Sequence, residues 1–136
     1  MTSWRPGWEA LPEPLASFWA ERHLCTLTTL RADGRPHVVP VGAPLDLEQR
    51  CAWIITNGSS AKAGHLRTRG PVAICQVDGA RWATIEGTGL VTEDPLDVAR
   101  AVERYAARYR QPRVNPARVA IRVSVERILC SASLLG

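Results

Sequence analysis

The clearest pattern along the chain is a strict alternation of apolar and polar positions near its C-terminal end. Every second residue from 119 to 125 is Val or Ile, and Ala, Arg and Ser occupy the positions between them. This period of two predicts a β-strand over residues 117–131 with one buried face. Runs rich in apolar and β-branched residues predict five more strands, two of them within 24–46 and one each at 51–56, 72–77 and 81–93.

Short turns connect the strands and three segments have helical spacing. The Asp-Gly pairs at 33–34 and 78–79 are strong β-hairpin signals, and Gly87 and Gly89 indicate a bend or bulge inside their strand. The predicted helices are 14–23, then 59–69 with Ser59 or Ser60 as N-cap, and 95–109 with Asp94 as N-cap.

These elements predict one domain over residues 1–136, mainly β with some α-helix. Of the 136 residues 46% are hydrophobic, which is enough for a sizeable core. Six strands in hairpins with intervening helices fit a small antiparallel β-barrel with short helices at its edges.

Charge and cysteine content narrow the choice of partners. The net charge of +4 favours an anionic partner, and a phosphorylated cofactor fits it as well as nucleic acid does. No block of like charges occurs, and no strand interleaves basic with several aromatic residues, which argues against a nucleic-acid interface. The four cysteines form no CxxC pair, and no stretch has the pattern of a signal peptide or a membrane span. We expect a cytoplasmic protein with reduced thiols and no membrane partner.

The sequence offers no obvious catalytic machinery made of side chains. It contains no nucleophile motif, and His23, His37 and His65 have no spacing that would chelate a metal, so no metal site is predicted. This points to a binding protein, or to an enzyme whose cofactor carries the reaction.

The best candidate for an anion site surrounds Lys62, the one lysine in a chain with sixteen arginines. It follows a polar turn at the start of a predicted helix, where free backbone N–H groups and the helix dipole favour an anion. Hydroxyls and guanidinium groups that could assist it belong to Thr56, Ser59, Ser60, Arg67 and Arg69. An ordinary capped helix with a solvated lysine explains the same spacing equally well.

Two other segments are weaker candidates. Pro36 and Pro40 remove ladder donors from their strand, which leaves backbone groups free to face a flat heterocycle; an irregular edge strand is the alternative. Gln76, Arg81 and Trp82 lie around the second predicted turn, although Trp82 could equally be a core residue.

The order of these segments resembles a known superfamily. "LTTLRADGRPHVVPVG" followed by "ITNGSSAKAGHLRTRGPVAICQVDGARWATIEGTG" is similar to the split-barrel flavin and deazaflavin oxidoreductases, the superfamily of the pyridoxamine-phosphate oxidases. The C-terminal "ERYAARYRQPRVNPARVAIRVSVERILCSASLL" resembles the actinobacterial coenzyme F420-dependent branch, and most closely its F420H2-dependent biliverdin reductases. The chain ends in "CSASLLG", where pyridoxamine-phosphate oxidases have a basic, tryptophan-containing substrate segment, so vitamin B6 oxidation is not expected.

The resemblance implies a six-stranded antiparallel split β-barrel that works as a homodimer, with cofactor sites at the subunit interface. It implies a phosphate cradle made of Gly58, Ser59, Ser60, Lys62 and Ala63. The cofactor ring would lie along the strand His37, Val38, Val39, Pro40 and Val41. The opposite side of the ring would be lined, from either subunit, by Gln76, Gly79, Ala80, Arg81 and Trp82. The implied contacts also include Thr56, and Arg67 and Arg110 suit the anionic oligoglutamate tail of F420.

The function that the resemblance implies is hydride transfer from reduced F420 to a conjugated acceptor, with biliverdin favoured. Two alternatives stay open: the same fold using FMN, and a non-catalytic carrier of F420 or a tetrapyrrole. No residue is assigned as catalytic, because Arg81, His37 and water are equal candidates for the proton donor.

Overall fold

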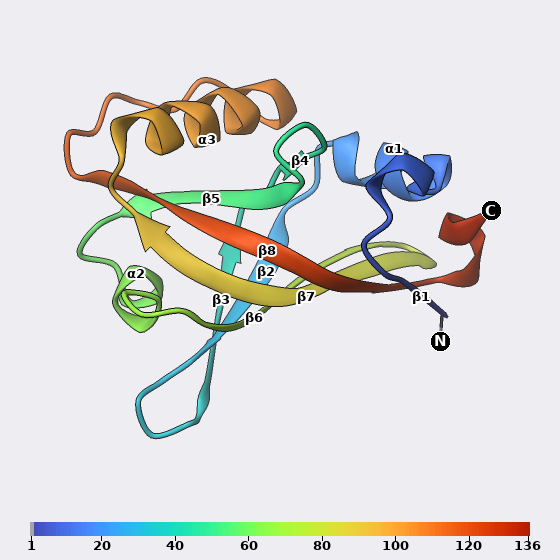
Figure 1. Ribbon diagram of the computed structural model, residues 1–136, viewed down its shortest axis with the longest axis horizontal. Helices are drawn as coiled ribbons and strands as arrows, with labels where there is room; N and C mark the ends of the chain where they lie inside the picture. The colour runs from blue at the N-terminus through green and yellow to red at the C-terminus, as the bar shows by residue number, and fades with distance from the viewer. Residues whose placement is uncertain (1) are drawn as a thin grey trace.

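The computed structural model describes residues 2–136 and contains eight strands and three α-helices (Figure 1). The strands are β1 (Thr2–Trp4), β2 (Cys25–Leu30), β3 (Pro36–Val41), β4 (Leu45–Asp46), β5 (Cys51–Asn57), β6 (Gly70–Asp78), β7 (Arg81–Thr92) and β8 (Arg118–Cys130). The helices are α1 (Glu13–Ala20), α2 (Ala61–His65) and α3 (Pro95–Arg108), with 3₁₀ turns η1 (Trp8–Ala10) and η2 (Ala132–Leu135).

All strands belong to one antiparallel sheet in the order β3-β2-β6-β7-β8-β5-β4, and β1 pairs with β8 as well. The mainly β class is therefore confirmed. The predicted count of six strands is too low, because the short strands β1 and β4 lack a sequence pattern of their own. The sheet is strongly curved, but β3 and β4 remain as separate ends, so it is not a closed barrel.

Alternate residues of β5 belong to two different cores. Ala52 and Ile54 pack into the main core, while Cys51 and Trp53 form a smaller cluster with Ala101 of α3. Successive strand residues point to opposite faces. Helix α3 therefore covers the face of β5 that the main core leaves free, which brings α3 next to the end of β3.

The turn signals are confirmed in detail. Gly34 and Gly79 have φ angles of 86° and 62° and lie in the β2–β3 and β6–β7 turns. The strand register shifts between Glu86 and Gly87, where the predicted bulge occurs. A Cβ atom on Gly87 would lie 2.0 Å from the Ser124 carbonyl oxygen, so only glycine fits there.

Two of the predicted helices are close to the observed ones and one is too long. The Asp94 carboxylate accepts a hydrogen bond of 2.9 Å from Leu96 N and caps α3, as predicted. Helix α2 has five residues instead of the predicted eleven-residue span 59–69, since the chain leaves the helix at Leu66. No helix within residues 2–136 has the length and apolarity that crossing a membrane requires.

Candidate functional site

A groove with a volume of about 270 Å³ opens between the ends of β3 and β5, helix α2, helix α3 and the segment before β8. Four residues that the sequence singled out line it together: Pro40, Val41, Thr56 and Lys62. Its other walls are Gly42, Ile55, Asn57, Tyr105, Pro112, Asn115 and Arg118. The structure thus joins the predicted phosphate segment to the predicted ring-binding strand.

The groove has uncompensated positive charge. Its lining includes Lys62 and Arg118 and no carboxylate. Burial lowers the pKa of Lys62, and no carboxylate of residues 2–136 lies within ion-pair distance of its Nζ. Arg118 Nη2 donates to the carbonyl oxygen of Arg113 at 2.7 Å, which fixes the guanidinium without neutralising it. An anion bound here would therefore meet two cations with no competing acidic group.

Hydroxyl groups of the β5–α2 connection form a short chain beside Lys62. Thr56 Oγ1 donates to Ser60 Oγ at 2.9 Å, and the same Ser60 oxygen accepts the N-cap bond from Ala63 N at 3.2 Å. Because the Ser60 oxygen accepts both of these hydrogen bonds, its own hydroxyl hydrogen is free to be donated to a ligand. Asn57 Oδ1 instead accepts from both the backbone N and the hydroxyl of Ser59, so the Ser59 side chain stabilises the loop.

Gly58 and Arg67 hold this connection in place. Gly58 N donates to Ala117 O at 2.8 Å, and a Cβ atom on Gly58 would lie 3.3 Å from that oxygen. Arg67 Nη2 donates to Gly58 O at 2.7 Å, and its Nη1 pairs with Glu93 at 3.2 Å. The structure therefore gives Arg67 a supporting position under the loop, and its predicted contact with the cofactor tail remains a prediction.

An aromatic wall faces the end of β3. A Cβ atom on Gly42 would lie 2.7 Å from Tyr105 Cε2 and 3.0 Å from Tyr109 Cε2, so the rings pack directly on the glycine. Tyr109 Oη donates to His23 O at 2.6 Å and accepts from Ala43 N at 3.1 Å, which fixes its ring. The Tyr105 ring packs against the Tyr109 ring at a centroid distance of 5.0 Å. Tyr105 therefore forms a flat side of the groove.

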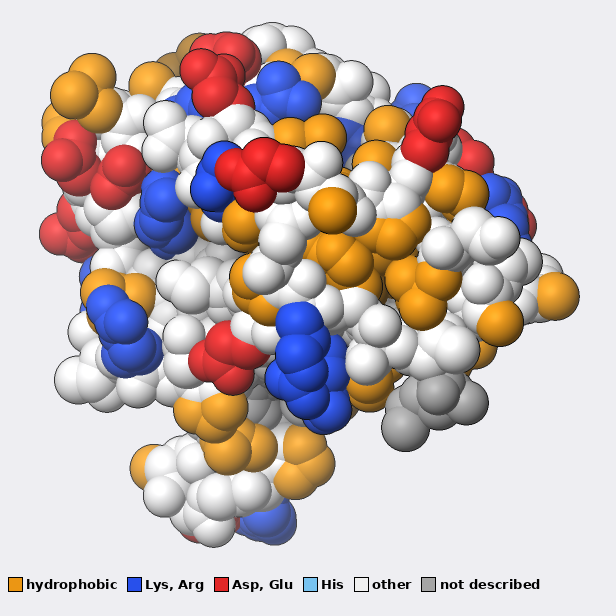
Figure 2. Space-filling model, turned by 45° about the vertical axis from the view of Figure 1, so that its right-hand side comes forward, with side chains coloured by type: hydrophobic (Ala, Val, Ile, Leu, Met, Phe, Trp, Pro, Cys, Tyr) orange, Lys and Arg blue, Asp and Glu red, His pale blue; other side chains and the backbone are white. Residues whose placement is uncertain are grey.

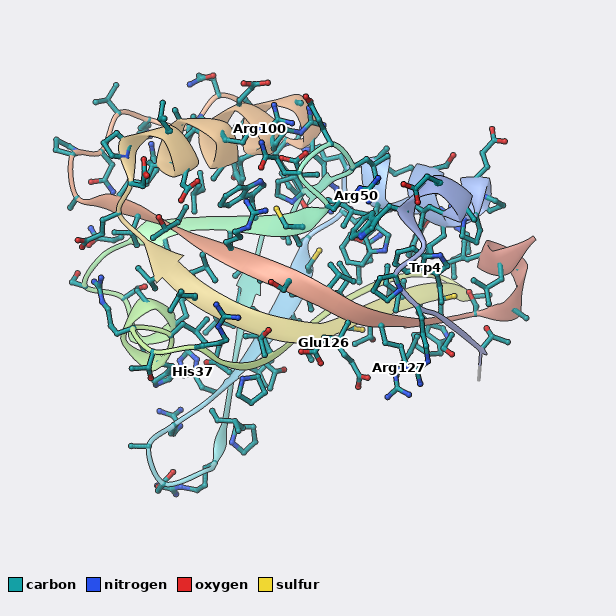
Figure 3. The ribbon with its side chains drawn as sticks, in the orientation of Figure 1. Trp4, His37, Arg50, Arg100, Glu126 and Arg127 are labelled. Atoms are coloured by element: carbon teal, nitrogen blue, oxygen red, sulfur yellow. The ribbon has the colours of Figure 1, made fainter. Side chains whose placement is uncertain are left out.

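His37 lies beside α2 at the base of the β2–β3 hairpin (Figure 3). Its ring meets the ring of His65 edge-on at a centroid distance of 5.0 Å, and its Nδ1 is buried with no hydrogen-bond partner among residues 2–136. Burial and the nearby charges of Arg31, His65 and Lys62 lower the pKa of His37. The lowered pKa favours the neutral imidazole, whose buried Nδ1 has no hydrogen-bond partner within residues 2–136.

Several residues that were predicted to bind the cofactor are not part of the groove lining. Val38 is exposed, Val39 packs against the main core, and Ala63 is fully buried and can contribute only backbone. Arg110 is exposed and is not part of the groove lining.

The turn that contains Gly79, Ala80, Arg81 and Trp82 is at the far end of the nine-residue strand β6 from α2. At a rise of ~3.3 Å per residue the two ends are ~26 Å apart, so this turn does not reach the groove of its own chain. Arg81 Nη2 pairs there with Glu21 at 2.9 Å and with Asp78.

Gln76 is a core residue, which corrects its predicted contact with the cofactor. Its side chain is 1% exposed. Nε2 donates to Phe18 O at 2.9 Å, and Oε1 accepts from Arg108 Nη2 at 2.6 Å. Both ends of the amide are used inside the protein, and nothing is left to face a ligand.

One cluster has the composition of a metal site. Ligand atoms of Glu21, His23 and Asp78 lie within 4.8 Å of one another. Arg81 donates to both carboxylates, and His23 Nε2 lies 2.9 Å from Glu21 Oε1. The Arg81 guanidinium thus already offsets one of the two negative charges and occupies both carboxylates with hydrogen bonds, and we assign no metal to the cluster.

The sequence analysis did not assign the other groove residues to the site, among them Tyr105, Pro112, Asn115 and Arg118. Tyr105 belongs to the apolar stripe of α3, and such a stripe normally indicates a packing face. Arg118 enters the groove because β8 pairs with β5 in a register that sets it opposite Asn57. Asn57 and Arg118 are 61 positions apart in the sequence, so local spacing carries no signal for this pairing.

Comparison with known proteins identifies relatives of this chain and its family. A protein of Mycobacterium tuberculosis (strain CDC 1551 / Oshkosh) named F420H(2)-dependent biliverdin reductase is 50% identical over 126 residues, which are 92% of this chain and 91% of that protein. The structure of a conserved hypothetical protein from Mycobacterium tuberculosis superposes with a TM-score of 0.72 at 26% identity, covering 85% of this chain and 81% of the other.

A structure named F420 reductase superposes with a TM-score of 0.70 at 22% identity, over 87% of this chain and 98% of the other, and shows a shared fold. Residues 11–130 match the family model described as pyridoxamine 5'-phosphate oxidase. These matches confirm the resemblance seen in the sequence, and the chain belongs to the pyridoxamine 5'-phosphate oxidase family.

Proposed function

We propose that this protein is a reductase that uses reduced F420 and transfers a hydride to a conjugated acceptor, biliverdin or a closely similar bilin. The observation that carries the proposal is the groove in which Lys62 and Arg118 lie beside the flat wall of Tyr105, with no carboxylate among the described residues that line it. Such a site suits a cofactor with a phosphate and an extended ring. The 50% identity to an F420H(2)-dependent biliverdin reductase supports F420 as the cofactor and biliverdin as the acceptor.

Each side of the groove has a separate role in this proposal. Lys62 pairs with the phosphate, and the Ser60 hydroxyl donates a hydrogen bond to it. Pro40 and Val41 lie along the ring, and Tyr105 keeps water from one side of it. Reduced F420 supplies the hydride when bound. The chain supplies position and charge, which is how a protein without a side-chain nucleophile accelerates such a step.

We also propose that the protein is a homodimer and that the turn at 79–82 of one subunit completes the groove of the other. The β2–β3 hairpin projects from the body of the molecule and carries apolar side chains (Figure 2). Leu30 and Val38 on this hairpin are 44% and 57% exposed. A partner subunit would cover them. The four cysteines are free, which supports a reducing compartment such as the cytoplasm.

Turnover under anaerobic conditions tests the proposed reaction. Purified protein is mixed with reduced F420 and biliverdin, and the loss of biliverdin absorbance is followed together with the return of oxidised F420 fluorescence. We expect one F420 to be oxidised for each bilin reduced. Binding of F420 without turnover would indicate a carrier, and turnover with reduced FMN alone would place the protein in the flavin branch; either result contradicts the proposal.

A further inference from the structure

A second cavity, with a volume of about 320 Å³, lies between α1, β4 and α3. None of its lining residues belongs to the groove described above. Its walls include Trp19 of α1, the loop after β4, and three arginines of α3. These arginines, Arg100, Arg104 and Arg108, are spaced four residues apart and therefore share one side of the helix.

The acidic groups of this cavity are already occupied. Arg100 pairs with Asp46 at 2.8 Å and with Glu48 at 3.1 Å, and these are the two carboxylates in the lining. Figure 3 shows Arg100 between α3 and the loop that carries β4. No further carboxylate in the lining is therefore left to pair with Arg104 or Arg108.

Arg108 is a buried cation with neutral partners only. It is 7% exposed, and it donates to Glu21 O at 2.8 Å, Ala43 O at 2.6 Å and Gln76 Oε1 at 2.6 Å. These acceptors satisfy N–H groups but do not compensate the positive charge. Buried charges in proteins are normally paired with an opposite charge.

Two side chains in the lining of this cavity each carry a buried donor that has no acceptor among residues 2–136. Arg104 Nε and Trp19 Nε1 are both shielded from solvent and make no hydrogen bond within residues 2–136. The Trp19 side chain is only 2% exposed, so bulk water does not satisfy it. Native proteins leave very few buried donors unpaired, and each exception calls for a missing partner.

We propose that this cavity binds a small oxyanion, a carboxylate or a phosphate, which accepts hydrogen bonds from Trp19 Nε1 and Arg104 Nε and compensates the charges of Arg104 and Arg108. An ordered water would supply acceptors but no negative charge, whereas an oxyanion supplies both. The volume is within the range of small-molecule pockets. The site is separate from the Lys62 groove, so it is a second ligand site on this protein and does not depend on the proposed reaction.

Titration followed by NMR tests this site. The protein has five tryptophans, and in ¹⁵N-labelled protein the Trp19→Phe variant identifies the Trp19 indole N–H signal among them. Inorganic phosphate and succinate are added in separate titrations, each matched to sodium chloride at equal ionic strength. We expect the Trp19 signal to move saturably with one or both anions and not with chloride, and the arm that saturates identifies phosphate or carboxylate as the ligand chemistry.

Three variants distinguish binding at this site from general charge effects. Arg104→Gln is expected to weaken the saturable response by about tenfold, the loss typical of a charge-assisted hydrogen bond. Arg35→Gln makes the same chemical change at the exposed β2–β3 turn and should leave it unchanged, as should Lys62→Ala in the groove. A Trp19 signal that neither anion moves, or a response that survives Arg104→Gln, would overturn the proposal.

Discussion

Arg108 Nη2 and Gln76 Oε1 form a buried hydrogen bond of 2.6 Å that ties α3 to β6. The Gln76 amide nitrogen continues the connection to Phe18 O of α1 at 2.9 Å. One side chain thus joins three elements that surround the core. Its role is structural, because loss of the amide would leave Nη2 of the buried Arg108 guanidinium and the Phe18 carbonyl oxygen without these partners.

Gln76→Met keeps the size of the side chain and removes both hydrogen bonds. We expect it to lower the free energy of unfolding by about 2–4 kcal/mol, the sum of two unsatisfied buried groups. Urea unfolding measures the loss. Val77→Met, at the neighbouring exposed position, is the matched control and should change stability by less than about 0.5 kcal/mol. Equal stability of the two variants would show that the amide does not hold these elements together.

The core position of Gln76 was available in the sequence, although the resemblance suggested a ligand contact. Val72 and Ile74 precede it at intervals of two, and all three are buried on the same face of β6. The strand period therefore places Gln76 in the core even though its chemistry is polar. Local patterns also identified both hairpins, the bulge at Gly87 and the caps of α2 and α3, since each depends on a few neighbouring residues.

The groove shows the limit of such patterns. Lys62 and Pro40 were recognised because each belongs to a local motif. Tyr105 and Arg118 reach the same place only through the packing of α3 on β5 and the register of β8. Strands β1 and β4 were not predicted, and α2 was predicted too long, for a related reason: short elements are stabilised by tertiary contacts more than by their own sequence.

Asp46 provides a pH-dependent test of the α3–β4 contact. Burial alone would raise its pKa, but hydrogen bonds from Arg100 at 2.8 Å, Gln49 N at 2.9 Å and Trp53 Nε1 at 2.9 Å outweigh burial and hold the pKa at about 2. An unfolded aspartate titrates near ~3.9, so the carboxylate stabilises the fold above that pH. This stabilisation is lost as the pH falls towards 2.

Asp46→Asn should therefore destabilise the protein more at neutral than at acid pH. The difference between its effects at pH 7 and at pH 2.5 is expected to be about 2 kcal/mol in urea unfolding. Asp33→Asn, on the exposed hairpin turn, should show little difference between the two pH values. An Asp46→Asn effect that is the same at both pH values would contradict the stabilising role of the ionised carboxylate.

Gly42 keeps the aromatic wall of the groove in place. Its added Cβ would lie 2.7 Å from Tyr105 Cε2, so Gly42→Ala must displace a ring that packs against it. We expect a loss of about 1–3 kcal/mol in stability together with weaker F420 binding. Gly64→Ala, in α2 with no atom within 4 Å of the new Cβ, should instead be neutral or stabilising by about 0.5–1 kcal/mol. Unchanged F420 affinity in Gly42→Ala would remove Tyr105 from the site.

The proposed dimer depends on the apolar hairpin. Sedimentation velocity at micromolar concentration should give a dimer for the wild-type protein and a shift towards monomer for Val38→Asp, which would bury a charge at the interface. Leu96→Asp changes another exposed apolar residue, 81% exposed at the start of α3, and should leave the dimer intact. A monomeric wild-type protein would exclude a site completed by a second subunit.

The central claim is that Lys62 binds the phosphate of F420, and its most direct test is the dissociation constant of F420 measured by fluorescence titration of wild-type protein, Lys62→Ala and the control Arg35→Ala. Loss of one charge-assisted hydrogen bond is worth about 1–3 kcal/mol, so we predict a dissociation constant about 5- to 150-fold higher in Lys62→Ala. Arg35→Ala should bind like the wild type. An unchanged constant in Lys62→Ala would contradict the phosphate assignment and with it the account of the groove.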